Sequence, residues 1–168
     1  MGWMVCGVDP GLGATGYGVL SAEGDGLRIV DAGVCKTDPK LDLATRLAQL
    51  EADLSSVLDE HRPNVVAVET RYSHYKHPRT AIVMGHARGI VLCLAGRRGI
   101  EVAELSATHV KKYLTGNGHA SKASIQRAIQ ITLGLSELPE PNDVADALCI
   151  ALCCAGDRCK TFAESGLA

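Results

Sequence analysis

The chain has 168 residues, of which 46% are hydrophobic, 21% charged and only 4% aromatic. This length and composition predict one ordinary globular domain with an aliphatic core. The N-terminus lacks the basic region and apolar run of a signal peptide, and no run approaches the ~18 apolar residues of a membrane helix. We therefore expect a cytoplasmic protein that is neither exported nor inserted into a membrane.

The formal net charge of −2 conceals a strong asymmetry along the chain. Residues 71–127 carry 10 Lys and Arg against 2 acidic residues, a local charge of +8, whereas the segments on either side carry −6 and −4. A basic middle third in a chain of net negative charge favours one surface that binds a polyanion such as a nucleic acid. On charge alone, a solvated helix face of mixed charge stays open as the alternative.

Three strand-like runs open the chain, separated by glycine-rich turns, over residues 4–8, 15–22 and 27–37. Such short connections predict an antiparallel meander. The apolar residues of 43–61 then recur at helical spacing, with Asp42 as a cap and Pro63 just past the end. Since the β-branched run 64–68 follows that helix, we expect its strand to lie parallel to the first strand.

The second half of the chain is expected to be mostly helical. Helices are predicted over 79–97, 108–114, 122–133 and 143–155, and a fifth strand over 100–105. Gly85 and Gly89 leave one face of the first of these helices without side chains, which permits another backbone to approach, either from within the chain or from a second subunit. The domain is expected to span 1–156, with 157–168 as a short C-terminal tail.

Four carboxylates occupy positions that suit a metal-dependent nuclease. Asp9 and Glu69 each end an apolar strand, and if the two strands run parallel these acids lie side by side. Asp143 and Asp146 are three residues apart at the start of a helix, so they share one face of it. Carboxylates gathered in one pocket repel one another, and a divalent cation would relieve that repulsion.

Each acid also has an ordinary structural interpretation. Asp9 precedes a Pro-Gly pair, where aspartate often only forms a turn, and Glu69 could be an exposed charge at a strand end. Asp143 and Asp146 could simply complement the dipole of a helix capped by Asn142. The combination of the four acids, more than any one of them, favours a site.

The same segments carry a family resemblance. The motifs are, in chain order, Asp9-Pro10-Gly11, Thr15-Gly16-Tyr17-Gly18, Ala67-Val68-Glu69, Gly116-Asn117-Gly118 with Ala120 and Lys122, and Asp143-Val144-Ala145-Asp146-Ala147-Leu148. With these motifs in this order, the chain resembles a bacterial RuvC-type Holliday-junction resolvase over about residues 5–155. The resemblance implies an α/β fold of the ribonuclease H-like type, with a five-stranded mixed sheet of order 3-2-1-4-5 and helices on both faces.

The resemblance also implies a function. It is that of a homodimeric crossover junction endodeoxyribonuclease, which cuts four-way DNA by paired symmetric nicks in homologous recombination and DNA repair. By position, the family's catalytic and metal-binding acids map to Asp9, Glu69, Asp143 and Asp146. A partner motor that migrates the junction is implied by resemblance only.

Phosphodiester hydrolysis needs a nucleophile formed near neutral pH and stabilisation of the leaving 3′-oxygen. Two Mg²⁺ ions ~3.5–4 Å apart can supply both, with Asp9 as our candidate for the bridging ligand. All-oxygen donors favour Mg²⁺ over zinc, although they leave Mn²⁺ open as a substitute. The products would carry a 5′-phosphate and a 3′-hydroxyl.

Basic residues interleaved with aromatic ones follow Glu69, where a loop at the edge of the site is expected. The DNA contacts predicted there are Arg71, Tyr72, Lys76 and Arg79. Such a loop can neutralise phosphates while an aromatic ring stacks on an unpaired base. The resemblance places the family's aromatic wedge at Tyr72, where better-known members carry Phe.

A second basic group comprises Lys111, Lys112, Lys122 and Arg127. Of these, Lys111 and Lys122 match positions where the family places lysines near the scissile phosphate. Arg97 and Arg98 are interpreted instead as ordinary cations at a helix C-terminus, outside the site.

The seven cysteines are odd in number and lie mostly in apolar runs, which argues against a disulfide framework. Four of them, Cys149, Cys153, Cys154 and Cys159, cluster near the C-terminus. Without a paired C-x-x-C motif, and with only isolated histidines such as His109 elsewhere, this cluster favours buried helical cysteines over a structural zinc site.

Two other classes of function stay open at this point. The run from Asp9 to Gly16 also resembles the phosphate-binding loop of actin-like phosphotransferases, although the chain is too short for their two-lobed nucleotide cleft. A noncatalytic DNA-structure binder would hold junctions without cutting them. The intact set of four acids argues against that second alternative.

Overall fold

The structure, a computed structural model, describes residues 3–23, 26–70 and 78–164. Five strands form one sheet in the order β3-β2-β1-β4-β5. Their bounds are β1 Trp3–Asp9, β2 Ala14–Glu23, β3 Gly26–Lys36, β4 Val65–Thr70 and β5 Glu101–Ser106. β1, β2 and β3 pair antiparallel, whereas β4 is parallel to both β1 and β5. The predicted meander, the parallel fourth strand and the order 3-2-1-4-5 are confirmed.

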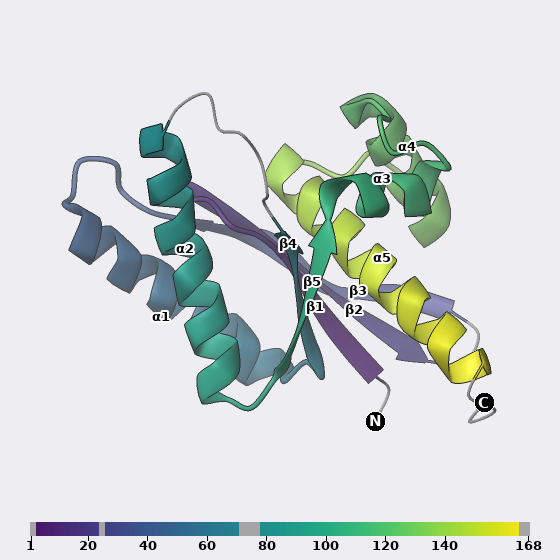
Figure 1. Cartoon of the computed structure of the whole chain (residues 1–168), viewed down its shortest axis with the longest axis horizontal. Coiled ribbons are helices and arrows are strands. Elements are labelled where there is room, and N and C mark those ends of the chain that lie inside the picture. Colours follow the sequence, from purple (N-terminus) through teal and green to yellow (C-terminus); the bar gives the residue numbers. More distant parts are fainter. Residues whose placement is uncertain (1–2, 24–25, 71–77, 165–168) are drawn as a thin grey trace.

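Helices cover both faces of this sheet, as Figure 1 shows. The helices are α1 Leu43–His61, α2 Pro78–Arg97, α3 Ala107–Thr115, α4 Lys122–Leu133 and α5 Asn142–Glu164. α1 and α2 pack on one face, and α5 lies across the other with α3 and α4 packed beside it. In the described part of the chain, none of the helices is long and apolar enough to cross a membrane.

One predicted helix boundary is wrong. We expected the last helix to end at residue 155, but α5 continues to Glu164 and takes up most of the segment 157–168 that we predicted as a tail. The helix passes through Gly156, where a Cβ would overlap the hydroxyl of Tyr113 on α3. Close packing of the two helices at this glycine outweighs its poor intrinsic helix propensity.

Local signals explain why α1 matches its predicted bounds. The Asp42 side chain caps the helix by accepting hydrogen bonds from the backbone N–H of Thr45 at 3.0 Å and from its hydroxyl at 2.6 Å. Arg62 ends the helix in the left-handed conformation, with φ at 46°. Between these ends, Leu50, Leu54 and Leu58 recur every four residues and are buried against the sheet.

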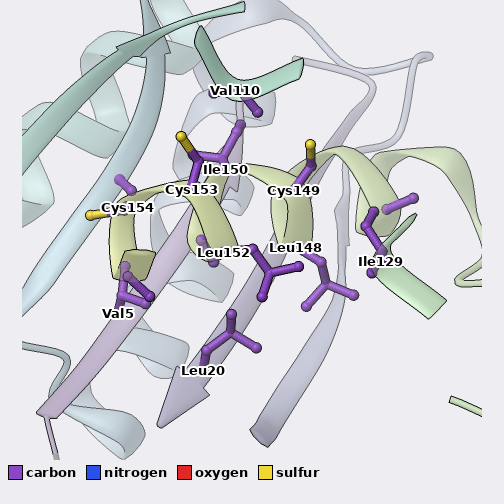
Figure 2. Packing of buried hydrophobic residues seen from close by; sticks show 14 of the residues in the cluster. Val5, Leu20, Val110, Ile129, Leu148, Cys149, Ile150, Leu152, Cys153 and Cys154 are labelled. Atoms are coloured by element: carbon purple, nitrogen blue, oxygen red, sulfur yellow. The ribbon is translucent and has the colours of Figure 1, made fainter. Parts of the chain in front are cut away.

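The core lies in two layers, one on each face of the sheet. Successive residues of β1 alternate between them, with Val5 packed toward α5 and both Cys6 and Val8 packed toward α1 and α2. The layer under α5 is aliphatic and rich in Leu, Ile, Ala and Cys, as Figure 2 shows. Five of the seven cysteines are buried. Because successive side chains of a strand point to opposite faces, the position of each acid in its strand decides which face of the sheet it lies on.

Candidate active site

Asp9 and Glu69 lie side by side at the carboxyl ends of two adjacent parallel strands. Val8 of β1 is in register with Val68 of β4, so the next residue of each strand is the acid. Since neighbours along a strand point to opposite faces, and Val8 packs toward α1 and α2, both acids are directed to the face that α5 covers. Both are partly buried.

The first turn of α5 brings Asp143 onto the same corner of the sheet. Asp9 pairs with Gly16 of β2 across the other edge of β1. A Cβ on Gly16 would overlap the backbone carbonyl of Asp143 and lie 3.0 Å from its Cβ. Asp143 therefore sits directly over the strand residue that neighbours Asp9.

Asp146, one turn further along α5, faces the side of the site formed by β4, α3 and α4. Its Oδ2 lies 3.8 Å from Nζ of Lys122, the first residue of α4. Burial is the main cause that raises the pKa of the Cys149 thiol, and the negative charges of Asp146 and Glu69 raise it further, while the positive charge of Lys111 lowers it. These three charged groups therefore surround the same part of α5.

The four predicted acids thus gather at one corner of the sheet, from β1, β4 and the start of α5. Each is partly buried, so water still reaches the corner. The donor set is entirely carboxylate oxygen, which suits a hard divalent cation such as Mg²⁺ that keeps part of its water shell. The role of each acid as a metal ligand stays a prediction.

Two of the predicted basic residues flank this corner directly. Lys111 of α3 is partly buried, and its positive charge lowers the pKa of the Cys149 thiol; Lys122 pairs with Asp146 while its own side chain is 73% exposed. Lys112 and Arg127 are exposed on α3 and α4, and Arg79 is exposed in the first turn of α2. Arg71, Tyr72 and Lys76 lie outside the described residues.

The two arginines left out of the site make their contacts elsewhere in the fold. Arg98 donates to both carboxylate oxygens of Asp59 on α1, at 2.8 and 2.9 Å, and also contacts Ser55. Arg97, in the last turn of α2, makes a long 3.9 Å ion pair with Glu51. Both contacts join the C-terminal end of α2 and the residue after it to α1, away from the four acids.

Glycines explain how α5 comes so close to the strands. A Cβ on Gly7 of β1 would lie 2.7 Å from the backbone nitrogen of Ala151 and 2.8 Å from its Cβ. A Cβ on Gly18 of β2 would lie 2.7 Å from Cδ2 of Leu148. Gly18 belongs to a motif that the sequence singled out, whereas the close approach at Gly7 was not predicted.

The sequence also missed a residue that holds the end of β4. Arg88 of α2 donates from Nη1 to the backbone carbonyl of Glu69 at 3.0 Å and pairs through Nη2 with Glu104 of β5. Its side chain is only 22% exposed. Arg88 therefore fixes the main chain that carries Glu69, and it ties α2 to the two strands beside the site.

Known proteins match this chain over most of its length. The family model described as Crossover junction endodeoxyribonuclease RuvC matches residues 5–154. The chain belongs to the RuvC family. Among its relatives, the Crossover junction endodeoxyribonuclease RuvC of Rhodopirellula baltica is 46% identical over 149 residues, which are 89% of this chain and 84% of the relative. The RuvC of Pseudothermotoga lettingae is 45% identical over 150 residues, covering 89% and 92% of the two chains.

Solved RuvC structures share the fold. The structure described as T. thermophilus RuvC in complex with Holliday junction substrate matches with a TM-score of 0.86 at 36% identity, over 91% of this chain and 93% of that one. A second structure, described as Thermus thermophilus RuvC structure, matches with a TM-score of 0.84, over 97% of this chain and 96% of that one. The ribonuclease H-like fold that the resemblance implied is confirmed.

Arg88 gives a first testable prediction. Changing Arg88→Ala is expected to lower the free energy of unfolding by about 1–3 kcal/mol, because the change removes charge-assisted hydrogen bonds at a mostly buried position. Arg97→Ala, on the same helix but 71% exposed, is the matched control and should change stability by less than about 0.5 kcal/mol. Chemical denaturation of both variants checks this. Equal effects would mean that Arg88 does not anchor β4.

Proposed function

We propose that this protein is a structure-selective endonuclease that resolves four-way DNA junctions by hydrolysing phosphodiesters at Asp9, Glu69, Asp143 and Asp146. The observation that carries the proposal is the meeting of these acids from β1, β4 and α5 at one corner, in a chain of the RuvC family. A matched relative has been solved in complex with a Holliday junction, which supports that DNA as the substrate.

Divalent cations held by the four carboxylates, two Mg²⁺ ions in our proposal, would supply an activated water and stabilise charge on the leaving 3′-oxygen. Asp9 is our candidate for the shared ligand because it has neighbours on both sides, with Glu69 on β4 and Asp143 over β2. The sheet and the buried part of α5 hold the backbones of these acids in place, so little reorganisation is needed when substrate binds.

The lysines beside the acids are proposed to receive the scissile phosphate. Lys122 contacts Asp146 at 3.8 Å, a distance typical of a loose ion pair that a phosphate can compete for. Lys111 approaches from α3 on the same side. Further along the DNA, Lys112, Arg127 and Arg79 would neutralise backbone phosphates, together with the segment that carries Arg71, Tyr72 and Lys76.

Paired symmetric nicks require two sites, so we propose that the protein acts as a homodimer. The exposed face of α2 supports this proposal. Ile82 is 60% exposed there, and a Cβ on Gly85 or on Gly89 would meet nothing within 4 Å in the described part of the chain. The sequence left open contact within the chain or with a second subunit for these glycines, and their open positions support our proposal of the second.

The dimer surface can be tested with Gly89→Arg. Because the position is open, the new side chain should leave the fold and its melting temperature nearly unchanged, while a charge placed in the interface should shift the protein to monomer. Analytical ultracentrifugation measures that shift. Ala52→Arg on the exposed face of α1 is the control and should stay dimeric. A dimer that persists in Gly89→Arg would place the interface elsewhere.

The function itself is tested with a synthetic four-way junction and Mg²⁺. We expect paired nicks at symmetric positions in two strands of like polarity, with 5′-phosphate and 3′-hydroxyl ends. Linear duplex of the same sequence is the control and should be cut far more slowly. Junction binding without cutting would support the noncatalytic binder instead, and equal cutting of both DNAs would remove the selectivity for structure.

A further inference from the structure

A second group of potential metal ligands lies at the seam between α3 and α5. His109 comes from the first turn of α3, and Cys153 and Asp157 are one turn apart on α5. One ligand atom from each, an imidazole nitrogen, a thiol sulfur and a carboxylate oxygen, all lie within 4.8 Å of one another. These residues are separate from the four acids and from the basic residues proposed to contact DNA.

The spacing of these atoms is close to that of a tetrahedral zinc site. Zinc bonds of ~2.0–2.3 Å place neighbouring ligand atoms roughly 3.3–3.8 Å apart. His109 Nε2 lies 2.7 Å from Asp157 Oδ2, and Cys153 Sγ lies 3.9 Å from the same oxygen. Small side-chain rotations of His109 and Asp157, which are 48% and 35% exposed, would therefore be enough to admit the ion between the three groups.

The backbones that carry Cys153 and His109 are held in place by their surroundings. Cys153 is fully buried and held by the middle of α5, and the hydroxyl of Ser106 caps the first turn of α3 by accepting from the backbone N–H of His109. Figure 2 shows the sulfurs of Cys149 and Cys153 on the side of α5 that faces Val110 of α3, while the sulfur of Cys154 points elsewhere. Because His109 and Asp157 are partly exposed, solvent water would supply the fourth ligand of the ion.

We propose that His109, Cys153 and Asp157 bind a zinc ion that joins α3 to α5. Imidazole, thiolate and carboxylate are the usual ligands of zinc, whereas the all-oxygen corner at the end of β1 suits magnesium. The Cys153 thiol loses its proton to solvent when the ion binds, and the histidine coordinates as the neutral imidazole. Because α3 also carries Lys111, the ion fixes a helix that borders the proposed active site.

Spectroscopy with Co²⁺ separates this site from the carboxylate site. The reduced, metal-free protein is titrated with Co²⁺ in excess Mg²⁺, which occupies the oxygen ligands. Only a thiolate ligand produces a sulfur-to-cobalt charge-transfer band, and we expect that band to saturate at one equivalent and to disappear when Zn²⁺ is added. Zn²⁺ should also raise the melting temperature of the protein.

Three variants assign the band. Cys153→Ser should abolish it, and His109→Ala, at a half-exposed position that should not disturb folding, should weaken Co²⁺ binding at least about 10-fold and remove the thermal shift with Zn²⁺. Cys154→Ser is the matched control on the same helix and should keep the band. Absence of the band from the unmodified protein, its persistence in Cys153→Ser, or unchanged affinity in His109→Ala would each overturn the proposal.

Discussion

Changing Asp9→Asn is expected to abolish junction cutting while leaving junction binding intact. The substitution keeps the size and shape of the side chain, so the packing at the end of β1 is preserved. It removes a negative charge that lies between Glu69, on the neighbouring strand β4, and Asp143, which packs over Gly16 of β2. Substituting a residue that hydrogen-bonds to a metal ligand usually lowers metal affinity or activity about 10–100-fold. Substituting a ligand itself should therefore lower the cutting rate by at least the upper end of that range.

Single-turnover cutting of a labelled junction measures this loss, and a gel-shift assay in Ca²⁺ or without metal measures binding. Asp53→Asn is the matched control, because that acid is exposed on α1, on the other face of the sheet. It should cut at the normal rate. If Asp9→Asn cuts as fast as the unmodified protein, the acid has no part in the reaction.

The change Gly16→Ala is expected to have a large effect for the addition of a single methyl group. The added Cβ would overlap the backbone carbonyl of Asp143, which cannot swing away as a flexible side chain can. Relieving that overlap must push the start of α5 off β2, at a cost of about 1–3 kcal/mol in the free energy of unfolding. For a chain of this length the melting temperature should fall by ~2–12 °C.

Displacing α5 should also impair the proposed chemistry, because its first turn carries Asp143 and its second turn carries Asp146. We therefore expect slower junction cutting at a temperature where Gly16→Ala is still folded, and weaker stabilisation of the variant by Mg²⁺. Gly26→Ala, at an exposed strand position where a Cβ meets nothing within 4 Å, is the control and should change neither stability nor rate. Normal stability of Gly16→Ala would contradict the close packing described here.

Much of the fold could be predicted because local and global signals agree. The sheet order followed from the family resemblance, and the parallel placement of β4 followed from a helix between two apolar strands. The bounds of α1 followed from Asp42 and Pro63. The end of α5 was mispredicted because Gly156 and the polar residues after it resemble a helix terminus, whereas the contact with Tyr113 is tertiary and leaves no local trace.

The positions of the four acids were predicted from the same kind of local signal, whereas the residues that hold those acids in place were not. Asp9 and Glu69 were predicted from their positions at the ends of strands, and Asp143 and Asp146 from their helical spacing. Arg88 was missed because its partner is the main-chain carbonyl of Glu69, which any residue would provide. A further cluster, that of His109 with Cys153 and Asp157, joins positions more than 40 residues apart, so only the packing of α3 on α5 reveals it.

The convergence of the four acids on a divalent cation is tested most directly by anomalous diffraction. Crystals of the protein would be soaked in Mn²⁺, which accepts the same oxygen ligands as Mg²⁺, and data collected at the manganese absorption edge. We predict anomalous peaks in contact with carboxylate oxygens of Asp9, Glu69, Asp143 and Asp146. Manganese bound elsewhere, with no peak at these four side chains, would contradict the proposed active site.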